Sequence, residues 1–113
     1  MKLYGIPNCD TVKKARAWLN EHGKSHEFHD FKKHGVSAEL LGQWVAQLGW
    51  EVLVNKQGTT WRKLDSASQA AVVDAASAIS LMQAHPSLIK RPVLNHDGQL
   101  LVGFKPEIYA ALP

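Results

Sequence analysis

The sequence predicts an α/β fold in a single domain spanning residues 1–113. Two strand-like segments flank a helical one near the N-terminus, and a hairpin signal followed by a short helix closes the chain. The stretch between these two halves is mostly helical in its periodicity. With 45% hydrophobic and 20% charged residues, the composition is that of one globular domain with an ordinary core, so no linker is expected.

The first segment, from Lys2 to Ile6, has β character and is broken by the turn residues Pro7 and Asn8. A helix follows, because apolar residues recur at helical spacing until Gly23 supplies a stop. Asn8 is the predicted N-cap of this helix. The apolar positions are Val12, Ala15, Trp18 and Leu19.

A second strand is predicted from Ser25 to Phe31, with Phe28 pointing inward. Strand, helix and strand together form a right-handed βαβ unit, which places the two strands parallel.

The middle of the chain is predicted to be helical. Ser37 is the N-cap of a helix that ends before Gly49, with an apolar stripe along one face. Residues 50–55 form a short apolar run of ambiguous type, and Thr59 or Thr60 is a candidate cap for the next turn. From 66 to 85 one buried face is expected, with Asp74 as a possible restart of a second helix. The residues of that face are Ala70, Val73, Ala76, Ile79 and Met82.

The last part of the chain is predicted to form a β-hairpin and a short helix. Pro86 ends the helical region, and residues 90–94 begin an extended segment. The turn signal at 95–98 separates two apolar runs. Pro106 opens a final helix in which Ile108, Tyr109 and Leu112 are expected to pack. The order is the thioredoxin-like one, β-α-β then β-β-α, with residues 36–86 as a helical insertion between the halves.

Charge and cysteine content restrict the function. A net charge of +3 and a pI near 9.1 suit anionic ligands, but no basic stripe interleaved with aromatic residues indicates nucleic acid. No signal peptide and no apolar run long enough to span a bilayer is present, so a cytoplasmic location is expected. The single cysteine excludes an internal disulfide.

That cysteine, Cys9, falls at the start of the first predicted helix. The unpaired N–H groups and the positive dipole end of a helix favour a thiolate there, and Lys13 and Lys14 follow one turn later. A lowered thiol pKa is therefore expected. The alternative is that Cys9 is a buried apolar filler.

The chain resembles the ArsC/Spx family, most closely its YffB-like branch, over essentially its whole length. The resemblance rests on four motifs: Tyr4-Gly5-Ile6-Pro7-Asn8-Cys9, Lys13-Lys14-Ala15, the block from His85 to Pro92, and Val102-Gly103-Phe104. The block from His85 to Pro92 together with a cysteine after the first strand is a strong signal.

The resemblance implies a catalytic thiol at Cys9 with Arg91 beside it, and a cis Pro92 against which an extended substrate can pair. Arginine stays protonated, so its planar fork can stabilise a thiolate or a bound oxyanion. The substrate or glutathione site is expected to include Asn8, Lys13, Pro92, Asn55 and Lys105.

Departures from the family pattern decide between activities. Arsenate reductases of the family carry three arginines around the cysteine, and only Arg91 matches one, with Asn55 and Lys105 nearest the other two positions. Gly5 also stands where the family has a histidine, so arsenate reduction is expected to be weak. Spx-like regulators often carry a CxxC motif, which this chain replaces with Cys9-Asp10-Thr11-Val12.

A single thiol can attack a disulfide or an oxyanion but needs a second thiol for release. The chain has no second cysteine, and glutathione is the common small cytosolic thiol, so glutathione is the expected thiol donor. A glutathione-dependent thiol–disulfide oxidoreductase is therefore the leading prediction. Glutathione acts as co-substrate, no tightly bound cofactor is expected, and glutaredoxin is a possible partner. The alternatives are a Spx-like protein-binding module without catalysis and a weak arsenate reductase.

Two other site types fit poorly. A phosphatase loop needs five residues between cysteine and arginine, whereas six separate Cys9 from Arg16. A zinc site is not predicted, because His26 and His29 would point to opposite faces of a strand. The four tryptophans fall mostly in apolar stripes and are expected in the core.

Overall fold

A four-stranded mixed sheet with two helices forms one of the two compact units of this chain. The computed structural model describes residues 1–113 and divides them into one unit of Met1–Phe31 with Arg91–Pro113 and another of Lys32–Lys90. The predicted insertion, residues 36–86, falls inside the second unit. Each unit is described separately below.

The sheet of the first unit has the predicted thioredoxin-like topology, β2-β1-β3-β4. Its strands are β1 (Lys2–Gly5), β2 (Glu27–Asp30), β3 (Val93–His96) and β4 (Gln99–Val102). The central strand β1 pairs in parallel with β2 and antiparallel with β3, and β3 pairs antiparallel with β4. The βαβ unit and the hairpin predicted from the sequence are thereby confirmed.

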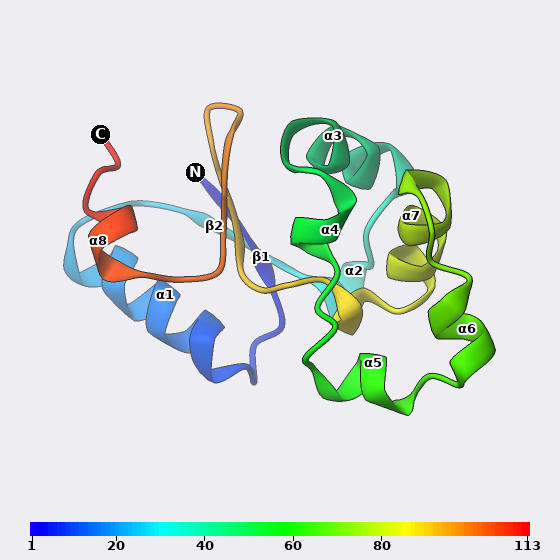
Figure 1. The fold of residues 1–113 in the computed structure, drawn as a ribbon. Helices are drawn as coiled ribbons and strands as arrows, with labels where there is room; N and C mark the ends of the chain where they lie inside the picture. The colour runs from blue at the N-terminus through cyan, green and yellow to red at the C-terminus, as the bar shows by residue number, and fades with distance from the viewer. The chain divides into compact units, whose positions relative to one another are not determined.

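One face of this sheet is covered by α1 (Asp10–Glu21) and α8 (Pro106–Tyr109), which lie beside each other in Figure 1. Their buried side chains meet those of β1 and β3. The core consists of Leu3, Ala15, Leu19, Leu94, Tyr109 and Leu112, with Trp18, Phe28 and Phe104 packed against it. Trp18 and Phe104 both contact the Tyr109 ring edge-on, with centroids 5.7 and 4.8 Å away.

The hairpin turn contains a residue pair with positive φ, as its Asp-Gly sequence predicts. Asp97 has φ of 50° and Gly98 of 90°. The Asn95 side-chain oxygen accepts a 2.8 Å hydrogen bond from the Gly98 N–H group, which closes the turn.

Two predictions for this unit need correction. The second strand is shorter than 25–31, because Phe31 already begins the short helix α2 (Phe31–His34). Tyr109 of α8 and Leu112 beyond it are buried as expected, but Ile108 is 47% exposed. One helical residue step rotates the side chain by about 100°, so neighbours in sequence cannot share one narrow buried face.

The second unit is helical, as predicted. After α2 it contains α3 (Ala38–Leu48), α4 (Trp50–Leu53), α5 (Thr59–Lys63), α6 (Ser66–Ala70), α7 (Ala75–Ala84) and the 3-10 turn η1 (Pro86–Leu88). Ser37 is the N-cap of α3, and its hydroxyl oxygen accepts a 3.1 Å bond from Leu40 N–H. The ambiguous run 50–55 forms α4 and then a bridge in which Val54 pairs with Ile89.

Two details of the helical region differ from prediction. Gly58, not Thr59 or Thr60, is the N-cap of α5. The stretch 66–85 is interrupted between α6 and α7, where Asp74 begins the second helix with a capping box to Ser77. This break resets the helical phase, so the predicted single face does not exist. Met82 is buried as predicted, but Val72 and Ala78 are buried in place of their neighbours, and Val73 is 70% exposed.

No helix combines the length and the hydropathy that a membrane span requires.

Candidate functional site

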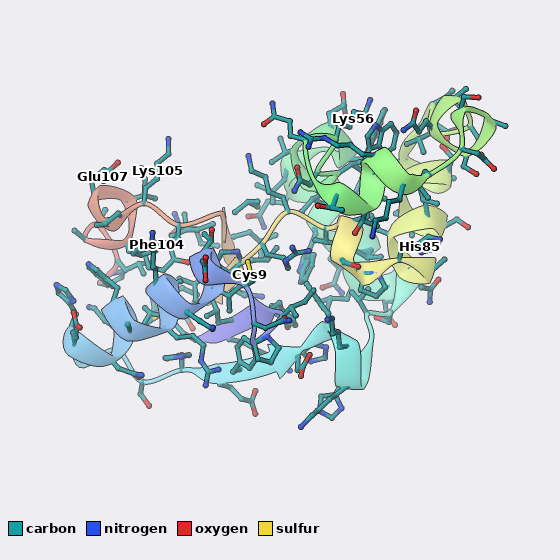
Figure 2. All side chains as sticks on the ribbon, turned by 90° about the horizontal axis from the view of Figure 1, so that it is seen from below. Cys9, Lys56, His85, Phe104, Lys105 and Glu107 are labelled. Carbon is teal, nitrogen blue, oxygen red and sulfur yellow. The ribbon has the colours of Figure 1, made fainter.

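Cys9 lies at the corner between β1 and α1, at the N-terminal end of the helix (Figure 2). The Cys9 N–H group donates a 3.2 Å hydrogen bond to the Ile6 carbonyl, which closes a four-residue turn with Pro7 in its second position. The Cys9 carbonyl then accepts the first helical bond, 2.9 Å from Lys13 N–H. Cys9 is part-buried and its thiol is free.

The prediction of Asn8 as N-cap is wrong, because Cys9 itself occupies that position. Its backbone is extended, with φ of −95° and ψ of 126°, and the helix starts at Asp10. Asn8 belongs to the preceding turn and is exposed. As a result, the sulfur is one residue closer to the unpaired N–H groups of the first helical turn than predicted.

Arg91 is positioned near Cys9 by the strand that follows it, β3. The Arg91–Pro92 peptide bond is cis, as the family resemblance implies, and Pro92 is buried. Directly after it, β3 pairs with β1 through Val93 opposite Tyr4. The Pro92 carbonyl accepts a 2.8 Å bond from Gly103 N–H. Arg91 is therefore fixed next to the end of β1, where Cys9 follows.

The environment of Cys9 holds the pKa of its thiol below the ordinary value. Burial raises this pKa, but three donors outweigh it: the Val12 N–H group, the Arg91 side chain through a hydrogen bond and through its charge, and the Thr11 N–H group. Lys13 and Lys14 are not among the causes. The thiolate is therefore favoured by the helix N-terminus and by Arg91.

The N–H groups of Val12 and Thr11 act on the sulfur without forming a regular cap. Cys9 makes no side-chain capping hydrogen bond of the kind that Ser37 and Asp74 make. Sulfur is a larger and weaker acceptor than oxygen. The effect of these groups on Cys9 is therefore mainly electrostatic stabilisation of negative charge.

Arg91 is not a fully exposed surface arginine. The residue is part-buried, and its Nε atom has no contact with solvent. A guanidinium held in this way interacts more strongly with a thiolate than a freely solvated one, since less water screens the pair.

The remaining predicted binding residues lie in different surroundings. Lys13 is exposed on the first turns of α1. Lys105 is the exposed N-cap residue of α8, and its side chain points away from Cys9 in Figure 2. Asn55 belongs to the second unit, where its N–H group donates to Leu88 and its side-chain oxygen accepts from Gln57 N–H. The first unit therefore brings together Cys9, Arg91 and Pro92.

Sequence reasoning missed the roles of Gly5 and Val12. The Val12 N–H group is one of the causes that lower the Cys9 pKa, although the sequence placed Val12 only in the core. A Cβ atom on Gly5 would lie 2.7 Å from a Val12 methyl carbon. A glycine inside a strand is a signal of close approach, and Gly5 could have been singled out on that basis.

No group of three or more His, Cys, Asp or Glu side chains is arranged to hold a metal ion. The His26 ring contacts the Lys24 carbonyl at 3.2 Å, and the His29 ring packs against Tyr4 with centroids 5.1 Å apart.

The chain was compared with protein-family models, curated proteins and solved structures, and each comparison found similar proteins. A family model described as ArsC family matches residues 4–112. The solved structure named YFFB protein is 55% identical, with a TM-score of 0.93, and covers 97% of this chain and 96% of its own. An arsenate reductase-related protein from Brucella melitensis is also 55% identical, with a TM-score of 0.77 over 97% and 91% of the two chains. A global transcriptional regulator Spx from Streptococcus agalactiae is 32% identical over 98% of this chain and 82% of the regulator.

Proposed function

This chain belongs to the ArsC family, and we propose that it is a glutathione-dependent thiol–disulfide oxidoreductase with Cys9 as its nucleophile. The observation that carries the proposal is the pairing of Cys9 with Arg91, which come from opposite ends of the sequence. A structural cysteine does not require an arginine side chain and helix N–H groups around its sulfur, whereas these groups favour a thiolate nucleophile.

The proposed reaction begins with attack of the Cys9 thiolate on a disulfide. With a glutathionylated substrate, the Cys9 sulfur bonds to the glutathione sulfur, the original S–S bond breaks, and the substrate leaves as a thiolate. A second glutathione thiolate then attacks the bound glutathione sulfur, which forms glutathione disulfide and frees the Cys9 thiolate. The net reaction consumes one free glutathione: the substrate sulfur is released as a thiol, and the glutathione it carried leaves as half of glutathione disulfide.

Arg91 has two functions in this scheme. It stabilises the Cys9 thiolate before attack and again when that thiolate is the leaving group of the second step. A thiolate of lowered pKa is also a better leaving group. The same arrangement therefore favours both half-reactions.

Recognition of glutathione is proposed to depend on its two carboxylates and its extended backbone. Arg91 and Lys13 supply positive charge on the first unit, the backbone before the cis Pro92 is the proposed edge for pairing, and Asn8 supplies an exposed amide.

Arsenate reduction is a weaker proposal. The relatives named as arsenate reductase-related support it. It lacks support from the residues, because Arg91 is the sole match to the three arginines implied by the family and Lys105 points away from Cys9 in Figure 2.

A protein-binding role without catalysis is the second candidate, and the 32% identity to Spx over nearly the whole chain favours it. In that case Cys9 would be dispensable. The two proposals therefore differ in what the thiol does.

The deciding experiment follows glutathione on Cys9 by intact mass. Reduced protein is incubated with glutathione disulfide, and we expect one glutathione adduct, which excess reduced glutathione then removes. Cys9→Ser is the control and should take no adduct. Reduction of a glutathionylated peptide by wild type but not by Cys9→Ser would complete the evidence. An unmodified wild type, or an adduct that persists in excess glutathione, would refute the proposal and favour the binding role.

A further inference from the structure

Gly5, at the end of β1, lies directly against the side chain of Val12 in the first turn of α1. A Cβ atom placed on Gly5 would lie 2.7 Å from Val12 Cγ2 and 3.3 Å from Cγ1. Distances under 3.0 Å are essentially never adopted by real Cβ atoms, so any side chain at this position would force the two elements apart.

The glycine is needed for space and not for backbone conformation. Five other glycines have a positive φ, and Gly5 is not one of them. It lies within regular β structure, opposite Asp30 of β2. An alanine could adopt this backbone without strain, so the neighbouring side chain is what excludes it.

Val12 cannot easily move away from a larger neighbour. Its side chain is fully buried, and a β-branched residue in a helix has one strongly preferred rotamer. A clash at Gly5 must therefore be relieved by displacement of the α1 first turn relative to β1.

That displacement would act on Cys9 from two sides. The N–H groups of Val12 and Thr11 belong to the turn that would move. Arg91 is attached to the sheet, since β3 pairs with β1 at Tyr4 and Val93. The sulfur lies between donors of the helix and a donor of the sheet, so the spacing of these two elements sets both interactions.

We propose that Gly5 is a positioning residue for Cys9: because it lacks a side chain, Val12 packs directly on β1, and this contact holds the first turn of α1 where its N–H groups and Arg91 act together on the sulfur. The inference rests on the proposed function of Cys9 as a nucleophile. It adds a residue that touches neither the substrate nor the reacting sulfur.

The test is the pH profile of thiol alkylation in Gly5→Ala. We expect the midpoint to rise from its low wild-type value toward that of an ordinary cysteine, about 8.5. The matched control is Gly42→Ala, because a Cβ there has no neighbour within 4 Å. This control should keep the wild-type midpoint. Thermal unfolding of each variant is measured in parallel.

A rescue variant separates positioning from a general loss of stability. Gly5→Ala with Val12→Ala removes both γ carbons that the new methyl would meet, while the nearest remaining atom, Val12 Cβ, is at an ordinary 3.7 Å. We expect this double variant to recover the low midpoint, with Val12→Ala alone as the reference of the cycle.

The outcomes distinguish this inference from the function on which it rests. A wild-type midpoint near 8.5 would refute the nucleophile itself. A low wild-type midpoint that Gly5→Ala leaves unchanged, even with lower thermal stability, would refute only the positioning role. If Gly5→Ala does not fold, the double variant decides: a folded protein with a low midpoint supports the inference, and any other result overturns it.

Discussion

At the scale of single residues, the proposed chemistry depends on how negative charge on the Cys9 sulfur is stabilised. Burial of Cys9 opposes ionisation, so the helix N–H groups and Arg91 must more than compensate for it. Arg91 combines a permanent charge with a side chain that is itself part-buried. Arg91 is therefore the cation that lowers the pKa of the Cys9 thiol, and the two lysines that follow Cys9 in sequence are not among the causes.

Arg91→Ala should move the midpoint of Cys9 alkylation up toward about 8.5, because it removes both a hydrogen bond and a positive charge from the thiolate. Arg91→Lys should recover part of the effect, since lysine keeps the charge but lacks the planar fork. The measurement is the rate of alkylation by iodoacetamide against pH. Some loss of stability is also expected, because the Arg91 stem is part-buried.

Arg16→Ala is the matched control for this prediction. Arg16 lies on α1 and packs over the Phe28 ring at 4.2 Å, and it is not among the causes of the Cys9 shift. If Arg91→Ala and Arg16→Ala leave the alkylation profile equally unchanged, Arg91 is a structural residue and Cys9 owes its pKa to the helix alone.

At the scale of the elements, helix caps determine where the segments of the second unit begin. Ser37 and Asp74 each accept a backbone hydrogen bond from the third residue of the following helix, at 3.1 and 2.9 Å. Asp74 has a further partner, since the Ser77 hydroxyl oxygen accepts from the Asp74 N–H group at 3.1 Å. This capping box explains why an alanine-rich stretch restarts as a helix at this residue.

The Asp74 cap makes the stability of the protein depend on acid pH. Hydrogen bonds from the Ser77 backbone and side chain hold the pKa of Asp74 below its usual value. A carboxyl group with a lowered folded-state pKa contributes stability that is fully present above its unfolded pKa, about 3.9, and is lost as pH falls through the folded value. We therefore expect the urea concentration at which half of the wild type is unfolded to decrease when the pH is lowered below about 4.

Asp74→Asn is the variant that isolates this contribution. Asparagine caps helices about as well as aspartate but does not titrate in this range. The variant should be close to wild type at low pH and should show a smaller decrease between neutral and acid pH. An identical pH dependence in both proteins would show that Asp74 does not stabilise the fold through its charge.

At the scale of the whole molecule, the candidate site, Cys9 with Arg91, belongs to one of the two compact units. The unit formed by residues 1–31 and 91–113 contains the sheet, Cys9 and Arg91, while residues 32–90 contain the helices α3 to α7. The first unit has a small core, and Tyr109 of the short helix α8 is one of its largest fully buried side chains. That residue connects α8 to α1 and the sheet.

Tyr109→Ala should lower the free energy of unfolding by about 3 kcal/mol or more, because it empties a large buried volume between Trp18 and Phe104. Tyr109→Phe keeps the ring and removes a hydroxyl that donates to the Gly103 carbonyl at a long 3.4 Å. Its cost should be under about 1 kcal/mol. Urea unfolding of the two variants measures the difference, and equal losses would mean that the hydroxyl and not the ring anchors α8.

The sequence by itself determined the elements and the candidate nucleophile. Short-range patterns identified the βαβ unit, the Asp97-Gly98 hairpin, the Ser37 cap and the restart at Asp74, because turns, caps and amphipathic faces are specified by residues a few positions apart. The same patterns failed in the stretch 66–85, where a break of four residues between α6 and α7 reset the helical phase. They also misplaced the cap of α1 by one residue.

Only the tertiary structure decided how the sulfur is surrounded. Cys9 and Arg91 are brought together by the pairing of β1 with β3, and that pairing depends on contacts between distant parts of the chain. The Gly5–Val12 contact has the same origin, because the space available at a glycine is set by what packs against it. Motifs indicated which residues matter, whereas distances between a helix and a sheet determine how they act on one thiol.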